Sequence, residues 1–365
     1  MFYSSSSQEA VNVVLHVFSN NVDTSIVQEF EVLPNASRVD CIDYADANGV
    51  LGLIGERLRG LNIFDASPLW LREVLKTKAR EAKKQYASEC DNRREVLLAL
   101  NRAGISCLVL KGAALGHILY TEPEMRPTRD LDLMVSSPDL DATRTILEGL
   151  GFLALDGVKT GQHIPRLQRT ACRGGSSFAV DLHHRLVPSE IYGIPLLELD
   201  SFWENSVIHN GPFGQYMTLG RLDHLLHLHL HLFHHIFYNF RLMHLVDLVT
   251  AFCKWTNVDL KLVARELDRI GLAQFRQDLW GWITAFFGVP LGDNHSDRQT
   301  LGVGTWLLQH GSLPPFGGLR YARSLRACLN NAAYECRRCF YWWFYAPNGR
   351  LMSKRRRPKK NVESQ

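Results

Sequence analysis

The chain has 365 residues, of which 46% are hydrophobic, and it carries 41 lysines and arginines against 37 aspartates and glutamates. That length is typical of two or three domains, and the hydrophobic content is sufficient for a buried core. Six of the bases and one of the acids follow Ser353, which leaves 35 bases and 36 acids in the body of the chain. Proteins that grip long nucleic acid usually spread positive charge over a folded face, so the near-neutral body argues against that class.

Residues 1–100 are predicted to form a mostly helical N-terminal region. The clearest helix runs from Leu69 to Leu100, which is rich in Lys, Glu, Ala and Leu and has few helix breakers. This region shows no chemical signature. The range 196–347 is predicted to be a helical C-terminal domain, and the polar, basic segment 348–365 is predicted to be disordered.

Between 101 and 195 the pattern changes to a compact α/β unit. Short apolar or alternating runs predict strands. A Ser-Pro start and a glycine stop predict one helix between them. The predicted elements are strand 106–110, helix 113–120, strand 129–135, helix 137–151 and a β-hairpin of 164–170 with 178–185.

Three aspartates are the main candidates for chemistry. Asp130 and Asp132 are two apart on a predicted strand, so both side chains point to one face. Asp181 lies in the second strand of the predicted hairpin, and the three carboxylates converge if that strand pairs beside the first. Clustered carboxylates repel one another unless a cation lies between them, and Mg²⁺ prefers oxygen ligands. The alternative is that the Asp-x-Asp pair marks only a solvated strand face.

The residues around these aspartates form a recognisable series: Leu108 to Leu115, Tyr120, Arg126 to Val135, His163 and Val180 to His183. This series resembles the family of uncharacterised nucleotidyltransferases within the polymerase-β-like superfamily. The resemblance runs from about Leu100 to Leu186, with weaker similarity to about Phe252.

This resemblance implies an α+β fold, with a nucleotidyltransferase-type mixed sheet, flanking helices, and helical N-terminal and C-terminal regions. It also implies a nucleotidyltransferase activity with two Mg²⁺ ions and a nucleoside triphosphate, for example ATP, as the donor. By position, Asp130, Asp132 and Asp181 match the catalytic metal ligands of the family.

The phosphate-binding segment departs from the wider superfamily, in which a Gly-Ser pair opens a helix about a dozen residues before the aspartate pair. Here the pair is Lys111-Gly112, and Asp130 follows eighteen positions after Gly112. Glycine still permits close approach of a phosphate to the helix N–H groups, and a lysine adds positive charge. Arg126 and Arg129 are further candidates to contact phosphate oxygens. The alternatives are a surface lysine and arginines paired with structural carboxylates.

A histidine-rich segment from Asp223 to Arg241 is predicted to be one apolar helix with a single polar stripe. The stripe contains Asp223, His227, His231, His234, Tyr238 and Arg241, and it is bordered by His224 and His235. It either faces the catalytic cleft, where His227, His231, His234 and Arg241 contact substrate, or binds a transition metal, or forms a hydrogen-bonded packing face. His183 is a further substrate contact or a structural support for Asp181.

The remaining patterns favour a cytoplasmic protein. Eight cysteines are scattered, and only Cys336 and Cys339 have a C-x-x-C spacing, so reduced thiols are a simpler interpretation than a four-cysteine zinc site. The N-terminus has no basic start followed by a long apolar stretch, and the uncharged stretch 299–319 is interrupted by prolines and glycines. We therefore expect no transmembrane segment.

The sequence thus predicts an enzyme that moves a nucleoside monophosphate from an NTP to a hydroxyl of an acceptor. The acceptor is a small molecule, a peptide, a protein or RNA, and the sequence does not choose among them. Two alternatives stay open: a catalytically degenerate nucleotide-binding or scaffold protein of the same fold, and a zinc hydrolase that uses the histidine-rich helix.

Overall fold

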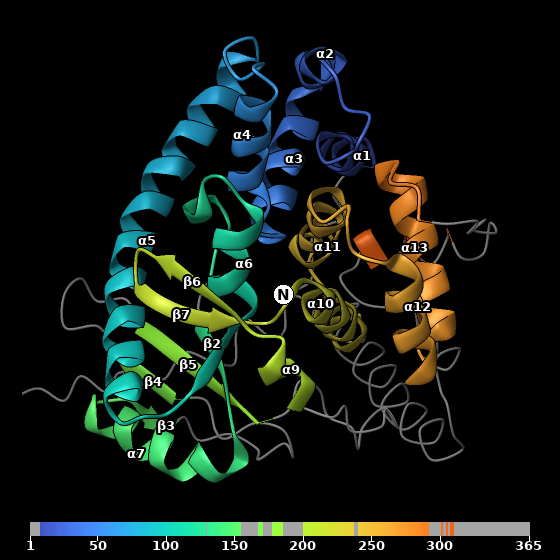
Figure 1. Cartoon of the computed structure of the whole chain (residues 1–365). Coiled ribbons are helices and arrows are strands. Elements are labelled where there is room, and N and C mark those ends of the chain that lie inside the picture. Colours follow the sequence, from blue (N-terminus) through green and yellow to red (C-terminus); the bar gives the residue numbers. More distant parts are fainter. Residues whose placement is uncertain are drawn as a thin grey trace, which may run out of the picture.

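The chain folds into an α+β structure in which one mixed sheet is flanked by helices, as predicted (Figure 1). The computed structural model describes residues 8–128, 130–154, 167–170, 177–184, 200–236, 240–291, 301, 304–305 and 307–309. Arg129, most of the C-terminal hundred residues and the predicted disordered tail lie outside the described residues.

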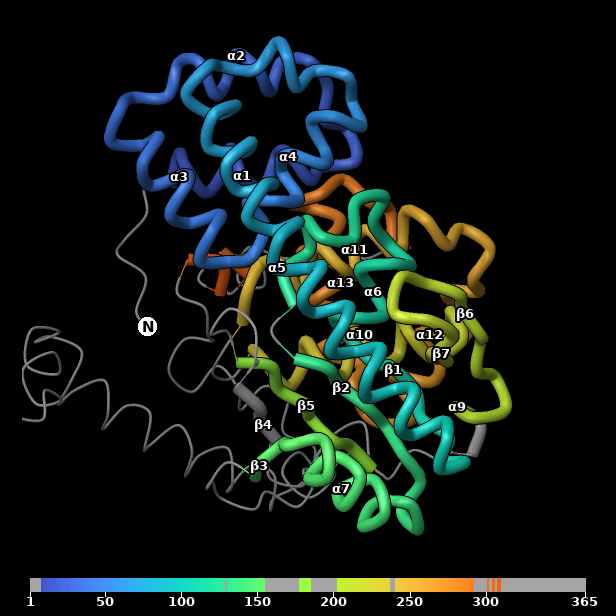
Figure 2. Tube along the Cα trace, turned by 90° about the vertical axis from the view of Figure 1, so that its left-hand side faces the viewer, coloured from blue at the N-terminus to red at the C-terminus, as the bar shows by residue number. Residues whose placement is uncertain are grey.

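Five helices build the N-terminal region: α1 (Gln8–Val17), α2 (Ser25–Val32), α3 (Asn35–Ala47), α4 (Leu51–Gly60) and α5 (Leu69–Arg102). Helix α5 corresponds to the clearest helix predicted from the sequence. Its 34 residues contain neither glycine nor proline, and the helix stops two residues before Gly104, which adopts a φ of +71°. Both views show α5 running from the N-terminal helices along the sheet (Figures 1 and 2).

Seven strands form the sheet of the described residues, in the order β3-β4-β5-β2-β1-β7-β6. Strand β2 pairs antiparallel with β1 and parallel with β5, and β5 pairs antiparallel with β4. The bounds are β1 (Cys107–Leu110), β2 (Asp130–Val135), β3 (Leu153–Ala154), β4 (Leu167–Thr170), β5 (Ser177–His183), β6 (Val207–Gly211) and β7 (Gly214–Thr218).

The alternating pattern of β2 and β5 is explained by a core on one face of the sheet. Leu131, Leu133 and Val180 are fully buried there against the inner residues of α5 and α7. The connecting elements are α6 (Lys111–Leu119), η1 (Pro123–Met125), η2 (Ser137–Asp139), α7 (Leu140–Gly149) and α9 (Asp200–Glu204). The opposite face of β2 and β5 carries the aspartates.

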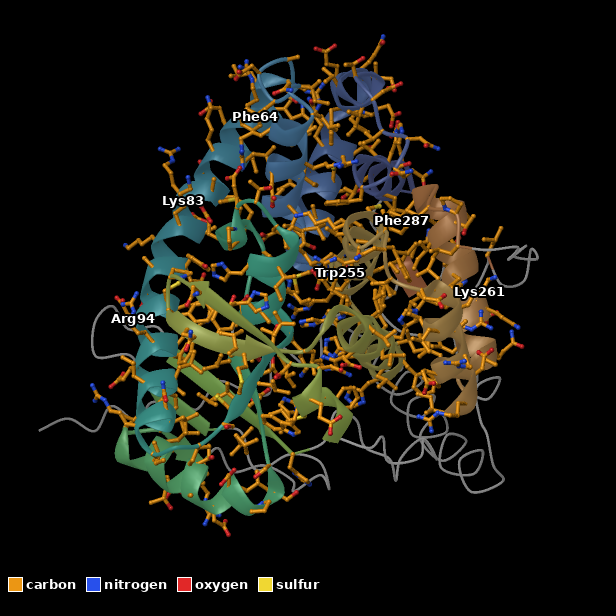
Figure 3. The ribbon with its side chains drawn as sticks, in the orientation of Figure 1. Phe64, Lys83, Arg94, Trp255, Lys261 and Phe287 are labelled. Atoms are coloured by element: carbon orange, nitrogen blue, oxygen red, sulfur yellow. The ribbon has the colours of Figure 1, made fainter. Side chains whose placement is uncertain are left out.

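The C-terminal helices are α10 (Arg221–His235), α11 (Leu242–Lys254), α12 (Leu260–Arg269) and α13 (Ala273–Phe287). They share one hydrophobic core with α1–α4. Figure 3 shows Trp255 and Phe287 within this packing, whereas Lys83, Arg94 and Lys261 point outward from α5 and α12.

The histidine-rich segment is not one helix, which corrects the sequence prediction. Helix α10 has its C-cap at Ile236, and Arg241 is the N-cap of the next helix, α11. The start of α11 is fixed by a distant residue: the Leu242 N–H donates to the Asn48 side chain at 2.8 Å, and the Met243 N–H donates to the Asn48 carbonyl at 3.2 Å. A helix start stabilised by tertiary contacts has no local sequence signal.

Strands β6 and β7 lie within 196–347, the range predicted to be a helical C-terminal domain. They extend the sheet beside β1, so the predicted boundary at residue 195 does not separate strands from helices. Among the described residues, no helix combines the length and the apolar character that crossing a membrane requires.

Candidate active site

The predicted convergence of the aspartates follows directly from the sheet. Strands β2 and β5 pair in parallel with Asp132 directly opposite Asp181, and Asp130 lies two residues before Asp132 on the same face. Asp132 is buried, with 4% of its surface exposed, whereas Asp130 and Asp181 are half-buried. The hairpin of β4 and β5 therefore brings the third carboxylate beside the Asp-x-Asp strand.

Asp132 is held as a carboxylate by two neighbours. The Lys111 ammonium donates to Asp132 Oδ1 at 2.6 Å, and the His183 Nε2–H donates to the same oxygen at 2.8 Å. Burial opposes ionisation of Asp132, but the Lys111 charge and the His183 hydrogen bond hold its pKa well below its usual range. Burial, followed by the Lys111 charge, lowers the pKa of His183. His183 thus supports Asp132, whereas the sequence interpretation left it as a substrate contact or a support for Asp181.

Lys111 interacts with all three carboxylates. Burial alone would lower its pKa, but Asp132, and then Asp130 and Asp181, raise it above its usual value. The Lys111 backbone has a φ of +47°, in the left-handed region that a residue with a side chain rarely adopts. Such strain is typically stored at functional sites and costs about 1–3 kcal/mol.

Gly112 brings the start of α6 close to the segment before β2. A Cβ atom at this position would lie 2.7 Å from Arg126 Nη1 and 2.7 Å from Thr128 Cγ2, closer than real contacts allow. The glycine of the Lys-Gly pair is therefore required by packing.

Arg126 forms a buried ion pair across the fold. Its Nε and Nη2 donate to the two carboxylate oxygens of Asp247 on α11 at 2.9 and 2.6 Å, and the Tyr120 hydroxyl donates to Asp247 Oδ1 at 2.7 Å. The side chains of Arg126 and Asp247 are only 5% and 2% exposed. The structure thus contains the structural pairing that the sequence left open for Arg126. The other arginine candidate, Arg129, is outside the described residues.

A cavity of about 520 Å³ lies in front of the carboxylates. Five parts of the chain line it: the end of α3 with the start of α4, one face of α5, the sheet with the start of α6, the segment from η1 to β2, and the α10–α11 corner. The lining residues are Asp46, Gly49, Leu51, Gly52, Lys78, Glu81, Ala82, Gln85, Tyr86, Glu89, Lys111, Gly112, Glu124, Met125, Arg126, Pro127, Thr128, Asp130, Asp132, Asp181, His231, His235, Arg241, Met243 and His244.

Only some of the residues predicted from the histidine-rich segment line the cavity. His231 and Arg241 line the cavity, whereas His227 and His234 are not among its lining residues. His227 is buried in α10 with 3% of its surface exposed. Burial, and then the nearby Lys111 charge, lower its pKa well below its usual value.

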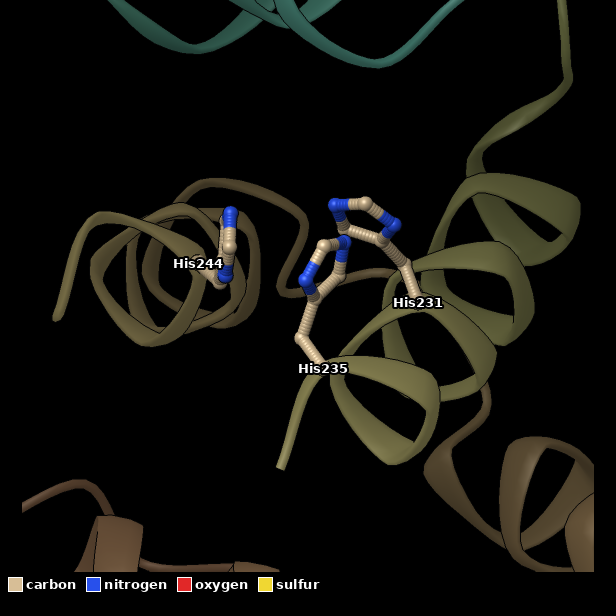
Figure 4. Close-up of side chains that lie close together, drawn as sticks. All are labelled: His231, His235 and His244. Carbon is tan, nitrogen blue, oxygen red and sulfur yellow. The ribbon is translucent and has the colours of Figure 1, made fainter. Parts of the chain in front are cut away.

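Two contributions to the cavity were missed by sequence reasoning. His244 on α11 joins His231 and His235, and the three imidazoles face one another (Figure 4). Helix α5 presents Lys78, Gln85 and Glu89 from a region that showed no chemical signature. The only available signal for α5 was the helical spacing of these residues, which is equally typical of a solvated face.

One of the three comparisons with known proteins gives a match. The model of the family described as uncharacterised nucleotidyltransferases matches residues 37–288, well over half of the chain. The match starts within α3, so it extends further toward the N-terminus than the resemblance recognised from about Leu100. Searches of curated proteins and of solved structures give no match. The chain therefore belongs to the family of uncharacterised nucleotidyltransferases.

Proposed function

We propose that the protein is a metal-dependent nucleotidyltransferase that moves a nucleoside monophosphate from an NTP to a hydroxyl of an acceptor. The observation that carries this proposal is the register of β2 and β5, which places Asp132 opposite Asp181 with Asp130 on the same face of the sheet. Family membership supports the reaction class. The cavity of about 520 Å³ has the size of an ordinary small-ligand site, for which 300–1,000 Å³ is typical.

The donor set fits Mg²⁺. Asp130, Asp132 and Asp181 supply carboxylate oxygens, which Mg²⁺ prefers, and all three carboxylates face the same cavity. These three carboxylates would hold the ions. When bound, Mg²⁺ neutralises phosphate charge and polarises the phosphoryl oxygens.

The side chains around the carboxylates have separate roles in the proposed reaction. Lys111, at the start of α6, would pair with oxygens of the triphosphate, because its ammonium lies beside the carboxylates that would hold the ions. His183 keeps Asp132 oriented. The Asp181 carboxylate accepts the proton of the acceptor hydroxyl as that oxygen attacks the α-phosphorus and pyrophosphate leaves.

A second candidate function is that of a catalytically degenerate nucleotide-binding protein. The specific observation in its favour is the 2.6 Å ion pair between Lys111 and Asp132, because this pair competes with a metal ion for the carboxylate. The two functions differ in turnover and not in nucleotide binding. Both predict that Asp132 is needed for Mg²⁺-dependent binding of an NTP.

The binding test is isothermal titration of the full chain with each NTP, with and without Mg²⁺. We expect binding to require Mg²⁺ and to be lost in Asp132→Asn. The matched control is Asp141→Asn, which removes a carboxylate whose side chain is 90% exposed on α7 and should bind as the wild type does. Equal binding by Asp132→Asn and wild type would refute the site.

The turnover test measures pyrophosphate release in the presence of a panel of acceptors. Asp130→Ala should abolish release while leaving the far-UV circular dichroism and the unfolding midpoint close to those of the wild type. Turnover retained in Asp130→Ala would refute the assigned role. Mg²⁺-dependent NTP binding without turnover for any acceptor would favour the degenerate protein.

A further inference from the structure

Three histidines form a cluster on the α10–α11 side of the cavity. One ring nitrogen from each of His231, His235 and His244 can be chosen so that all three lie within 4.8 Å of one another. His231 and His235 are four residues apart on α10, which places both rings on one face of the helix, and His244 faces them from α11 (Figure 4). The ring centroids are 4.3, 4.6 and 4.9 Å apart.

The chemistry of this cluster differs from that of the aspartates. Its ligand atoms are imidazole nitrogens, which bind metals in the neutral form of the ring. Imidazole nitrogen suits Zn²⁺, Ni²⁺, Cu²⁺ and iron, whereas Mg²⁺ prefers oxygen. The cavity therefore has two sets of ligands for two different classes of metal ion.

A buried histidine elsewhere on α10 shows what a purely structural role looks like. His229 is fully buried, its Nδ1 donates to the Leu225 carbonyl at 2.7 Å, and its Nε2 accepts from Trp280 Nε1 at 2.9 Å. Both of its nitrogens are used by the interior. The rings of His231, His235 and His244 instead line the cavity that contains the three carboxylates.

The cluster is close to the geometry that a metal requires. At Zn–N distances of 2.0–2.1 Å, the nitrogens of a tetrahedral site are about 3.4 Å apart, so a separation of up to 4.8 Å closes with small ring rotations. The Nδ1 of His244 accepts from the Arg241 N–H over a long distance of 3.4 Å. Ligation through Nε2 places the proton on Nδ1 and sacrifices only this weak bond.

We infer that His231, His235 and His244 bind one transition-metal ion, Zn²⁺ or a similar ion, with an open coordination position that faces the cavity. Three protein ligands and one open position are typical of catalytic zinc sites rather than structural ones. A further step rests on the proposed function: the open position takes an oxygen of the acceptor and so places it opposite the carboxylate site.

Co²⁺ is the probe for the test, because tetrahedral Co²⁺ absorbs visible light. The full chain is prepared without a polyhistidine tag, treated with chelator and titrated with Co²⁺ in the absence of nucleotide. The titration uses a Cys336→Ser, Cys339→Ser background, since a C-x-x-C pair can bind Co²⁺ through its thiolates. In the presence of excess Mg²⁺, which competes for the three carboxylates, we expect one Co²⁺ per chain, visible absorption bands, and displacement by Zn²⁺.

Single substitutions locate the site. His231→Ala and His244→Ala should each weaken Co²⁺ binding by more than about 100-fold, which exceeds the usual effect of losing a residue that only orients a ligand. His16→Ala removes an imidazole of α1 that neither belongs to the cluster nor lines the cavity, and it should bind Co²⁺ as the wild type does. Circular dichroism checks that each variant is folded.

Two outcomes would overturn the inference: no Co²⁺ binding by the wild type, or binding that is unchanged in both cluster variants. If the variants unfold, X-ray absorption of the Co²⁺-loaded wild type identifies the ligands instead, because three imidazoles give a characteristic scattering pattern. The absence of that pattern would overturn the site. Asp132→Asn should keep Co²⁺ binding and lose Mg²⁺-dependent NTP binding. Failure of the histidine site and failure of the proposed function are therefore distinguishable.

Discussion

The buried pair of Arg126 and Asp247 gives a prediction with a clear magnitude. It joins the segment before β2 to α11 through two charge-assisted hydrogen bonds, and the Tyr120 hydroxyl adds a third. With both side chains 95% buried or more, removing one charge leaves the other without a partner in the interior. We expect Asp247→Asn to lower the free energy of unfolding by about 3–5 kcal/mol.

The matched variant removes all the polar groups together. In a triple variant, Tyr120→Phe, Arg126→Met and Asp247→Leu, no buried charge or hydroxyl remains unpaired, so its stability should return to within about 2 kcal/mol of the wild type or exceed it. Urea unfolding followed by circular dichroism, in the presence of chelator, measures both variants. A loss below about 1 kcal/mol in Asp247→Asn, with an unchanged denaturant slope, would refute the argument that this pair is desolvated.

Two further changes test other parts of the fold. Burial lowers the pKa of His224 to about 3, so only the unfolded state takes up a proton as the pH falls below about 6.5. The wild type therefore loses stability on acidification. Relative to His224→Gln, its free energy of unfolding should fall by roughly 3 kcal/mol between pH 7.5 and pH 4.5. A difference between the two proteins that stays constant over this range would contradict the buried, neutral state of His224. Gly112→Ala places a methyl group against Arg126 and Thr128, so it should lower the free energy of unfolding by about 1–3 kcal/mol and weaken NTP binding. The control is Gly149→Ala, whose methyl group meets no neighbour within 4 Å and should leave stability unchanged or raise it. Equal unfolding midpoints for the two alanine variants would contradict the close packing at Gly112.

The central strands were predictable because their pattern is local. Alternation of buried and polar residues identified Asp130–Val135 and Ser177–His183 to within one or two residues, and the carboxylates share a face whenever the two strands pair. The resemblance to the family gave the reason for expecting that pairing. Strands β6 and β7 were missed because they add to the edge of a sheet that begins about a hundred residues earlier in the chain.

The contacts that the sequence did not predict join distant segments. Arg126 and Asp247 are 121 residues apart, so no local pattern could choose between a phosphate and a carboxylate as the partner of this arginine. Similarly, His244 belongs to a different helix from His231, and the start of that helix is fixed by Asn48 from the N-terminal region. Long-range packing decided both outcomes.

The length of α5 imposes a constraint on how this chain can vary. Its cavity-lining residues, Lys78, Glu81, Ala82, Gln85, Tyr86 and Glu89, follow the helical repeat in steps of three and one. Since each residue turns the helix by about 100°, inserting one residue after Lys78 would rotate the rest of this face away from the carboxylates. Without a glycine or proline in α5 to absorb the change, the chain tolerates substitutions here far better than insertions or deletions.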